Sequence, residues 1–146
     1  MILDVILRVC TKLFIPFILM FALYVQLHGD FGPGGGFQAG VIVAAAIILY
    51  AIIFGQGAAV RVAPNWLVEA MVPLGVMIYA GVGVWSMQAG GEFLNYNVLF
   101  HNPPDQQQAV EGQHWGIFLV EIGVFVTVSG TMLTIFYCFA GRGRPE

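Results

Sequence analysis

One acidic residue lies deep inside an apolar stretch near the end of the chain. Glu121 comes six residues after Trp115, in the segment GIFLVEIGVFVTVSG, which places it about 9 Å along a helix that begins at the tryptophan. A carboxyl group at that depth in a membrane costs at least about 2 kcal/mol and usually faces protein or water. Its neighbours three and four positions away are all apolar. We therefore expect Glu121 to face another helix or subunit, either as an inter-helix hydrogen bond or as a relay for protons or cations.

Two further charged residues lie near the ends of their apolar stretches. Lys12 and Glu69 each stand four residues before a proline, Pro16 and Pro73 respectively. A proline inside a helix frees the carbonyl group four residues earlier, so each charge lies beside an interrupted backbone. An ion pair between Lys12 and Glu69 is one interpretation. The other is that Lys12 extends to the lipid headgroups while Glu69 lies at the membrane interface.

The histidines give a weaker indication of a functional site. A metal site needs three or four converging ligands, which the spacing of His28, His101 and His114 does not indicate, so we predict no metal. A proton-handling role at the mouth of a path suits His28, which has Asp30 close by. The chain shows no nucleophile with a base and an orienting group, so we predict no catalytic residues and no enzymatic activity. The ion-path candidates are Glu121, Asp30, His28, Glu69 and Lys12.

The most unusual backbone is the stretch HGDFGPGGGFQAG, residues 28–40. A phosphate-binding loop of the Walker type needs a Lys and a Ser or Thr after its last glycine, and this stretch has neither. Glycine at a tight turn between two helices is the better interpretation, because glycine adopts positive φ without steric cost. Gly36, Gly40 and Ala44 then form a stripe of small residues that lets another helix approach closely. An alternative is that glycine carbonyls line a path for ions or water.

The amino-acid composition indicates the environment, water or lipid, in which these residues lie. Of the 146 residues, 59% are hydrophobic and 9% are charged, and the mean hydropathy is +0.85. A soluble domain of this size cannot bury so much apolar surface, because small domains leave much of their chain exposed. The chain is therefore predicted to lie in the lipid bilayer. Its net charge of −3 and the absence of a basic stripe in the sequence argue against binding to nucleic acid.

Four apolar stretches are long enough to cross a membrane as helices. They run over residues 9–27, 37–54, 66–87 and 115–139, and we predict a single all-α membrane domain, an antiparallel four-helix bundle that packs against other subunits. The loop over residues 88–114 contains FLNYNVLF, which we expect to lie on the membrane surface or against a partner. All five Lys and Arg residues fall on one side of this topology, so the positive-inside rule places both termini in the cytoplasm and the 88–114 loop outside.

Two segments resemble a known family. HGDFGPGGGFQAGVIVAAAIIL looks like the signature of the B subunit of Mrp-type (also called Mnh-type) multisubunit Na+/H+ antiporters, in which a PGGGF motif follows the first helix and a helix rich in small residues follows the motif. GIFLVEIGVFVTVSGTMLTIFY is similar to the last helix of that family. The residues that match the motif, which we carry over as a structural signature, are Pro33, Gly34, Gly35, Gly36, Phe37 and Gly40.

The resemblance implies an accessory subunit in a bacterial cytoplasmic membrane. Such a complex exports Na+ in exchange for external H+, without a nucleotide or redox cofactor, and serves pH homeostasis. Its other subunits, A, C, D, E, F and G, become the expected partners. The alternative is a purely structural assembly subunit of a related complex I-like membrane complex. A channel built from this chain alone is disfavoured, because Glu121 and Thr131 lie about 80° apart around the helix and form no polar stripe.

Overall fold

The fold consists of helices joined by turns. The computed structural model describes residues 2–29, 34–99 and 106–141, with α1 (Ile2–Leu27), α2 (Gly36–Phe54), α3 (Gln56–Val62), α4 (Asn65–Gln88), the 3₁₀ turn η1 (Tyr96–Val98) and α5 (Gln106–Gly141). Within these residues, four segments are long and apolar enough to cross a membrane: Asp4–Leu27, Gly36–Phe54, Asn65–Gln88 and Glu111–Gly141. The prediction of an all-α protein with four membrane-crossing helices is confirmed.

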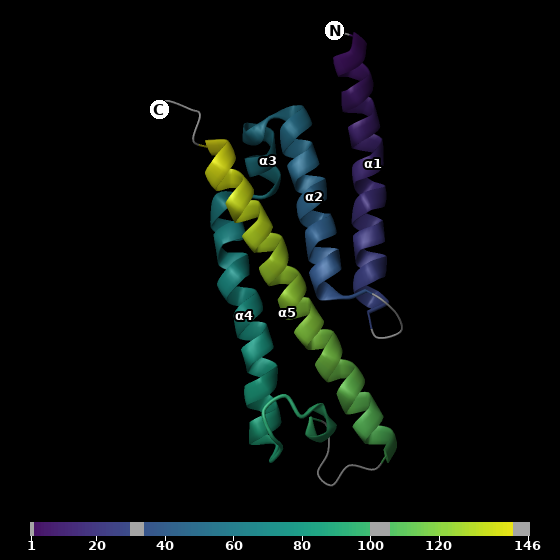
Figure 1. Ribbon diagram of the computed structural model, residues 1–146, viewed down its shortest axis with the longest axis vertical. Coiled ribbons are helices and arrows are strands. Elements are labelled where there is room, and N and C mark those ends of the chain that lie inside the picture. Colours follow the sequence, from purple (N-terminus) through teal and green to yellow (C-terminus); the bar gives the residue numbers. More distant parts are fainter. Residues whose placement is uncertain (1, 30–33, 100–105, 142–146) are drawn as a thin grey trace.

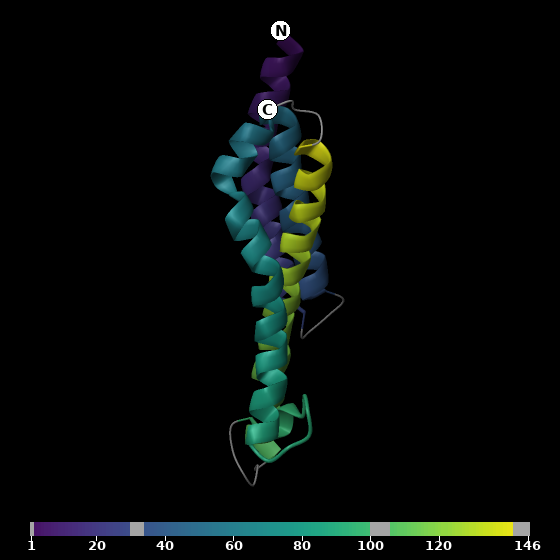
Figure 2. The ribbon, with the colours of Figure 1, turned by 90° about the vertical axis from the view of Figure 1, so that its left-hand side faces the viewer.

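The central helix is α5. It packs against α4 on one side and α2 on the other, and α1 packs mainly against α2. The order across the molecule is therefore α4, α5, α2, α1 (Figure 1). Long helices that follow one another along the chain run in opposite directions, so the neighbours α5 and α2 run parallel to each other. Seen edge-on, the helices largely overlap (Figure 2). This flat arrangement leaves much of every long helix open to its surroundings.

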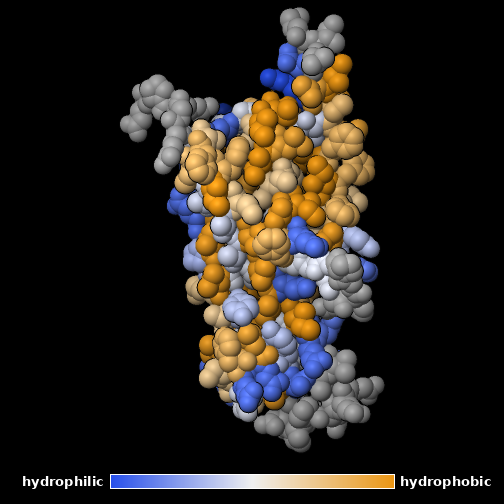
Figure 3. All heavy atoms as spheres, viewed as in Figure 1, coloured by the Kyte–Doolittle hydropathy of each residue, from blue (hydrophilic) through white to orange (hydrophobic). Residues whose placement is uncertain are grey.

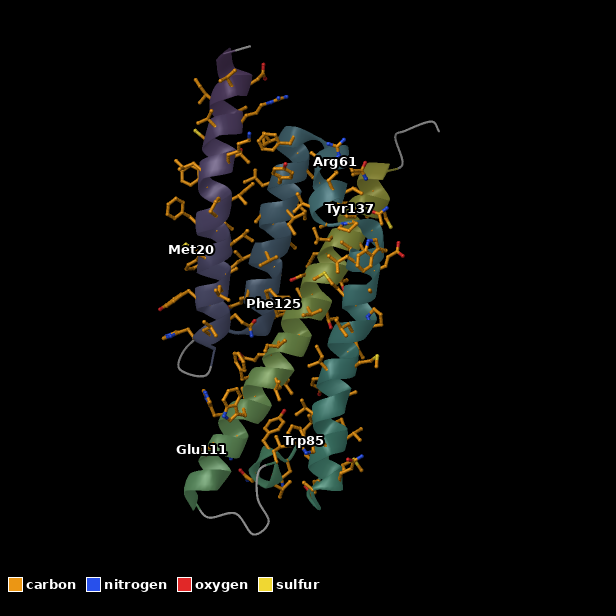
Figure 4. All side chains as sticks on the ribbon, turned by 180° about the vertical axis from the view of Figure 1, so that it is seen from behind. Met20, Arg61, Trp85, Glu111, Phe125 and Tyr137 are labelled. Atoms are coloured by element: carbon orange, nitrogen blue, oxygen red, sulfur yellow. The ribbon has the colours of Figure 1, made fainter. Side chains whose placement is uncertain are left out.

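Small residues form the contacts between the helices. Most of the buried apolar residues are alanines, whereas many large apolar side chains are exposed on the outer faces; one example is Met20, which is 67% exposed and points away from the bundle (Figure 4). Apolar side chains cover most of the visible face of α1 and α2 (Figure 3). Lipid tails solvate large apolar side chains well, so close contact between small residues is what holds membrane helices together. The buried alanines are Ala22, Ala39, Ala44, Ala46, Ala51, Ala59 and Ala63.

Two glycines bring α4 and α5 into backbone contact. A Cβ atom added to Gly123 would lie 2.8 Å from the carbonyl oxygen of Gly75, and one added to Gly75 would lie 2.7 Å from the backbone nitrogen of Thr127. Both distances are too short for a real Cβ contact. The crossing of α4 and α5 therefore depends on glycine at both positions.

The helices are offset along the long axis of the molecule. Gly29 at the end of α1 and Gly35 before α2 lie beside Glu121, which is well along α5 and not at its beginning. About 22 Å of α5, from Gln106 to Glu121, therefore extends beyond these two glycines. The first turns of α5 occupy residues that we assigned to the 88–114 loop.

The segment 89–99 covers this extension of α4 and α5. We predicted that FLNYNVLF lies on the membrane surface or against a partner, and in addition its described residues pack on this chain. The ring of Phe93 lies against Gly83 of α4, and Tyr96 lies against Gly112 and Gly116 of α5. Glycines on both helices leave room for these rings, so the segment packs on its own chain. Burial raises the pKa of the Tyr96 phenol, and the nearby Tyr79 adds to the increase.

A buried serine fastens this segment to α4. The Ser86 hydroxyl is fully buried and lies 2.8 Å from the carbonyl oxygen of Gly83 and 3.0 Å from that of Glu92. It also accepts a hydrogen bond of 3.0 Å from the backbone N–H of Leu94. Leu94 has a φ of +63°, which is costly for a residue with a branched side chain. The Ser86 hydroxyl thus helps to hold a strained turn in place.

At the opposite end of the molecule, α3 joins α2 to α4. The Tyr137 hydroxyl donates a hydrogen bond of 3.0 Å to the carbonyl oxygen of Ala63, just after α3. Tyr137 and Arg61 lie at this end, whereas Trp85 and Glu111 lie at the other (Figure 4). The start of α1 and the end of α5 are also at the end that holds Arg61 (Figure 1).

Candidate functional site

The carboxyl group of Glu121 lies against two glycines, Gly29 after α1 and Gly35 before α2. Its two oxygens are 2.5 and 2.6 Å from the position that a Cβ atom would take on Gly29. Oε1 is also 2.7 Å from the corresponding position on Gly35. A side chain at either glycine would occupy the space that the carboxyl group fills. We call Gly29, Gly35 and Gly36 the glycine cradle.

The cradle depends on a backbone that only glycine adopts easily. Gly35 immediately precedes α2 and has a φ of +128° and a ψ of −172°, a combination that is strained for every other residue. Its carbonyl oxygen accepts a hydrogen bond of 3.1 Å from the N–H of Ala39, which begins the ladder of α2. Gly35 therefore turns the chain sharply into the helix and at the same time leaves room for the acid.

The third glycine of the cradle contacts the backbone of the acidic residue. A Cβ atom on Gly36 would collide with the carbonyl oxygen of Glu121. One turn later, a Cβ atom on Gly40 would lie 2.9 Å from the carbonyl oxygen of Phe125 and 3.0 Å from Cβ of Val128. Gly36 and Gly40 therefore hold α2 and α5 in backbone contact over two turns.

A hydrogen bond reinforces this contact between α2 and α5. The fully buried Ser129 lies with its hydroxyl 3.2 Å from the carbonyl oxygen of Gly40 and 2.8 Å from that of Phe125. Because the cradle and this contact belong to one helix pair, the position of the carboxyl group is fixed by the packing of α2 on α5.

The other residues of the motif have different surroundings. Gly34 lies close to α1, since a Cβ atom there would be 3.2 Å from the carbonyl oxygen of Val25. Phe37 is 60% exposed and points out of the helix pair. Pro33 and Asp30, which we singled out from the sequence, lie outside the described residues.

His28 directly precedes the cradle. It is exposed, and its ring stacks on Tyr24 with 5.3 Å between the ring centroids. At the far end of the molecule, His114 packs edge-on against Trp115 at 6.1 Å. Among the described residues, no three His, Cys, Asp or Glu side chains gather as a metal site would require. His28 is therefore the one described histidine that adjoins the Glu121 site.

Lys12 and Glu69 are not brought together. The ammonium group of Lys12 lies 5.5 Å from the centroid of the Phe54 ring of α2. Glu69 lines a small hollow between α4 and α5, together with Asn65, Thr134 and Tyr137. Since α1 and α4 form opposite edges of the flat bundle (Figure 1), one chain cannot form the ion pair that we considered.

Sequence reasoning missed two residues, Gly29 of the Glu121 site and Gln26 of a neighbouring groove. Gly29 was not distinguished from the other glycines of the turn, although it approaches both carboxyl oxygens of Glu121. Gln26, in the last turn of α1, is only 6% exposed. An amide near the end of an otherwise apolar stretch was the available signal for Gln26. Gly29 gave no signal, because its role depends on how far the turn reaches along α5.

Comparison with known proteins identifies the family of this chain. The family described as "Domain related to MnhB subunit of Na+/H+ antiporter" matches residues 6–134. The antiporter subunit mnhB2 of Staphylococcus haemolyticus is 31% identical over 139 residues, which cover 94% of this chain and 95% of that protein. The B subunit of the Na+/H+ antiporter of Bacillus subtilis is 29% identical over 134 residues, which cover 88% and 92%. The chain belongs to the MnhB family of Na+/H+ antiporter subunit domains.

Proposed function

We propose that this chain is an accessory membrane subunit of a multisubunit Na+/H+ antiporter, and that Glu121 takes part in its ion path as a protonatable group. The family and the names of the relatives support the first part. The observation that carries the second is the enclosure of the Glu121 carboxyl group by Gly29 and Gly35. A carboxyl group in a membrane protein usually serves a pathway for ions or protons or pairs with another group.

The cradle suits a group that gains and loses a proton. Glu121 is only partly buried, so its carboxyl group is held by backbone on one side without being sealed from its surroundings. His28 lies one residue before Gly29 and its side chain is exposed. An imidazole changes charge near neutral pH. In this proposal, His28 exchanges protons with water at the mouth of the path, and Glu121 holds them at the helix crossing.

The basic residues set the proposed orientation. All five Lys and Arg residues belong to the side of both termini, which the positive-inside rule assigns to the cytoplasm. The Glu121 site then faces the outside of a bacterial cytoplasmic membrane, where H+ enters in exchange for cytoplasmic Na+. The proposed partners are the A, C, D, E, F and G subunits of the antiporter, and the transported ions are those of the whole complex.

The test replaces Glu121 within the assembled antiporter. We expect Glu121→Gln to remove Na+-driven proton exchange in inside-out vesicles while the complex assembles in normal amount, because the amide keeps the shape of the side chain but cannot carry a proton. Glu121→Asp should keep part of the activity. Glu111→Gln is the matched control, since Glu111 is an exposed acid on the same helix and should leave exchange unchanged.

A purely structural role is the competing function. The contact of Gly36 with the backbone of Glu121 favours it, because this contact fixes α2 on α5 whatever the carboxyl group does. If Glu121→Gln transports normally in an assembled complex, Glu121 is a structural residue and the chain acts as a scaffold. The two functions therefore give opposite results in the same vesicles.

A further inference from the structure

A large apolar groove runs between α1 and α5. Its volume is about 430 Å³, and α2 contributes Val43 to its lining. The α1 wall is formed by Leu19, Leu23 and Leu27, and the α5 wall includes Phe118, Ile122 and Phe125. On each wall these residues recur every three or four positions, so the groove follows one face of each helix for about two turns.

One polar residue, Gln26, lines this groove. Its side chain is 6% exposed. Both atoms of its amide, Oε1 and Nε2, are buried and have no hydrogen-bond partner. Buried polar groups in folded proteins nearly always have partners, and the bilayer interior offers none to replace them. A buried amide with no partner is therefore a sign that something polar is missing from the groove.

We propose that the groove between α1 and α5 binds a transmembrane helix of another antiporter subunit, and that this helix brings an uncharged hydrogen-bonding side chain, Ser, Thr, Asn or Gln, to the amide of Gln26. This inference rests on the proposed function, which supplies the other subunits. The amide both donates and accepts, so these four side chains satisfy it without adding a charge to an apolar groove. The last side-chain torsion of a glutamine is soft, so its amide can turn toward such a partner.

The shape and chemistry of the groove distinguish a helix from other occupants. A lipid tail would fill the apolar walls but leave the amide of Gln26 without a partner. Water alone needs two to four polar contacts in a cavity, and apart from Gln26 the lining is apolar. Apolar residues that recur every three or four positions along both walls match the ridge of side chains on a helix, which is how helices bind in apolar grooves.

The test uses Gln26→Leu in the complete antiporter. We expect the amount of assembled complex to fall about tenfold, because a side-chain hydrogen bond between membrane helices contributes about that factor. Gln38→Leu is the matched control, since Gln38 is an exposed glutamine on the neighbouring helix α2, and it should leave assembly unchanged. If Gln26→Leu assembles and transports normally, the groove faces lipid and the proposal is overturned.

Assembly with loss of transport would also overturn the proposal, because Gln26 would then serve the ion path. That result is distinct from the Glu121→Gln test, which is made in a complex with an intact groove.

A second measurement keeps the proposal testable if Gln26→Leu does not fold. A nitroxide spin label at Leu23→Cys, in the complex in lipid nanodiscs, should show the low accessibility to dissolved oxygen of a protein contact, whereas accessibility typical of lipid would refute a docked helix.

Discussion

Gly36 and Glu121 meet backbone to backbone: a Cβ atom on Gly36 would collide with the carbonyl oxygen of Glu121. The residue that carries the carboxyl group is therefore also a point of close backbone contact between α5 and α2. This relationship links the chemistry of the site to the packing of the helices, because any change that separates the two backbones also withdraws the carboxyl group from Gly29 and Gly35.

The first prediction concerns Gly36→Ala. The added methyl group forces α2 away from α5, and overpacking of this kind destabilises a protein by about 1–3 kcal/mol or more. We expect a lower midpoint of thermal unfolding and less assembled complex, measured by size-exclusion chromatography of the heated, fluorescently tagged antiporter. Gly57→Ala is the control. Nothing lies within 4 Å of the added atom there, and alanine favours the helix by about 1 kcal/mol, so the midpoint should not fall.

Glycine should be equally necessary where α4 crosses α5. Gly75→Ala places its methyl group against Thr127, and Gly123→Ala places one against the carbonyl oxygen of Gly75. Each change should lower the unfolding midpoint of the complex. Because both changes separate the same two backbones, the double variant should be less destabilised than the sum of the single variants, as expected for residues in contact.

The control for this crossing is another glycine of α4. An added Cβ atom on Gly81 meets nothing within 4 Å, so Gly81→Ala should not lower the unfolding midpoint. Equal losses for Gly75→Ala and Gly81→Ala would mean that glycine is needed for helix flexibility and not for close contact.

The sequence predicted the helices well because the signal was local. Long apolar stretches and the turn residues between them are enough to predict four membrane-crossing helices, and these are present. The small residues Gly36 and Gly40 suggested a close helix contact, and in the structure they lie against α5. These inferences require only periodicity and the size of single residues.

The contacts that the sequence did not reveal depend on how far one helix is shifted along another. Hydropathy does not specify the offset that brings Gly29 and Gly35 beside Glu121, so Gly29 gave no sign of its role. The same offset leaves an extension of α4 and α5 that the segment 89–99 covers. Glycines such as Gly83 and Gly116, which receive the rings of that segment, looked like ordinary small residues of membrane helices.

A double-mutant cycle tests the positions of the charged residues in α1 and α4. Lys12→Ala and Glu69→Ala should add within about 0.5 kcal/mol in the stability of the complex, because residues on separate edges of the bundle do not couple. Lys12→Ala with Phe54→Leu should instead show a coupling of about 0.5–1 kcal/mol, the usual strength of an exposed contact between a cation and an aromatic ring. Strong coupling between Lys12 and Glu69 would contradict the arrangement in Figure 1.

The final prediction concerns the segment 89–99. Ser86→Ala removes the hydroxyl that accepts from the N–H of Leu94 and lies within hydrogen-bond distance of the carbonyl oxygen of Glu92. Leaving buried groups unpaired costs about 1–3 kcal/mol, and Leu94 then loses support for its positive φ. We expect the segment to detach locally, so that proteases cleave it faster in the purified complex while α1 and α2 stay protected. Thr131→Ala, which removes an exposed hydroxyl bonded only within α5, should leave the cleavage rate unchanged. Equal cleavage of the Ser86→Ala variant and the unaltered protein would show that the aromatic contacts of Phe93 and Tyr96 hold the segment without the serine.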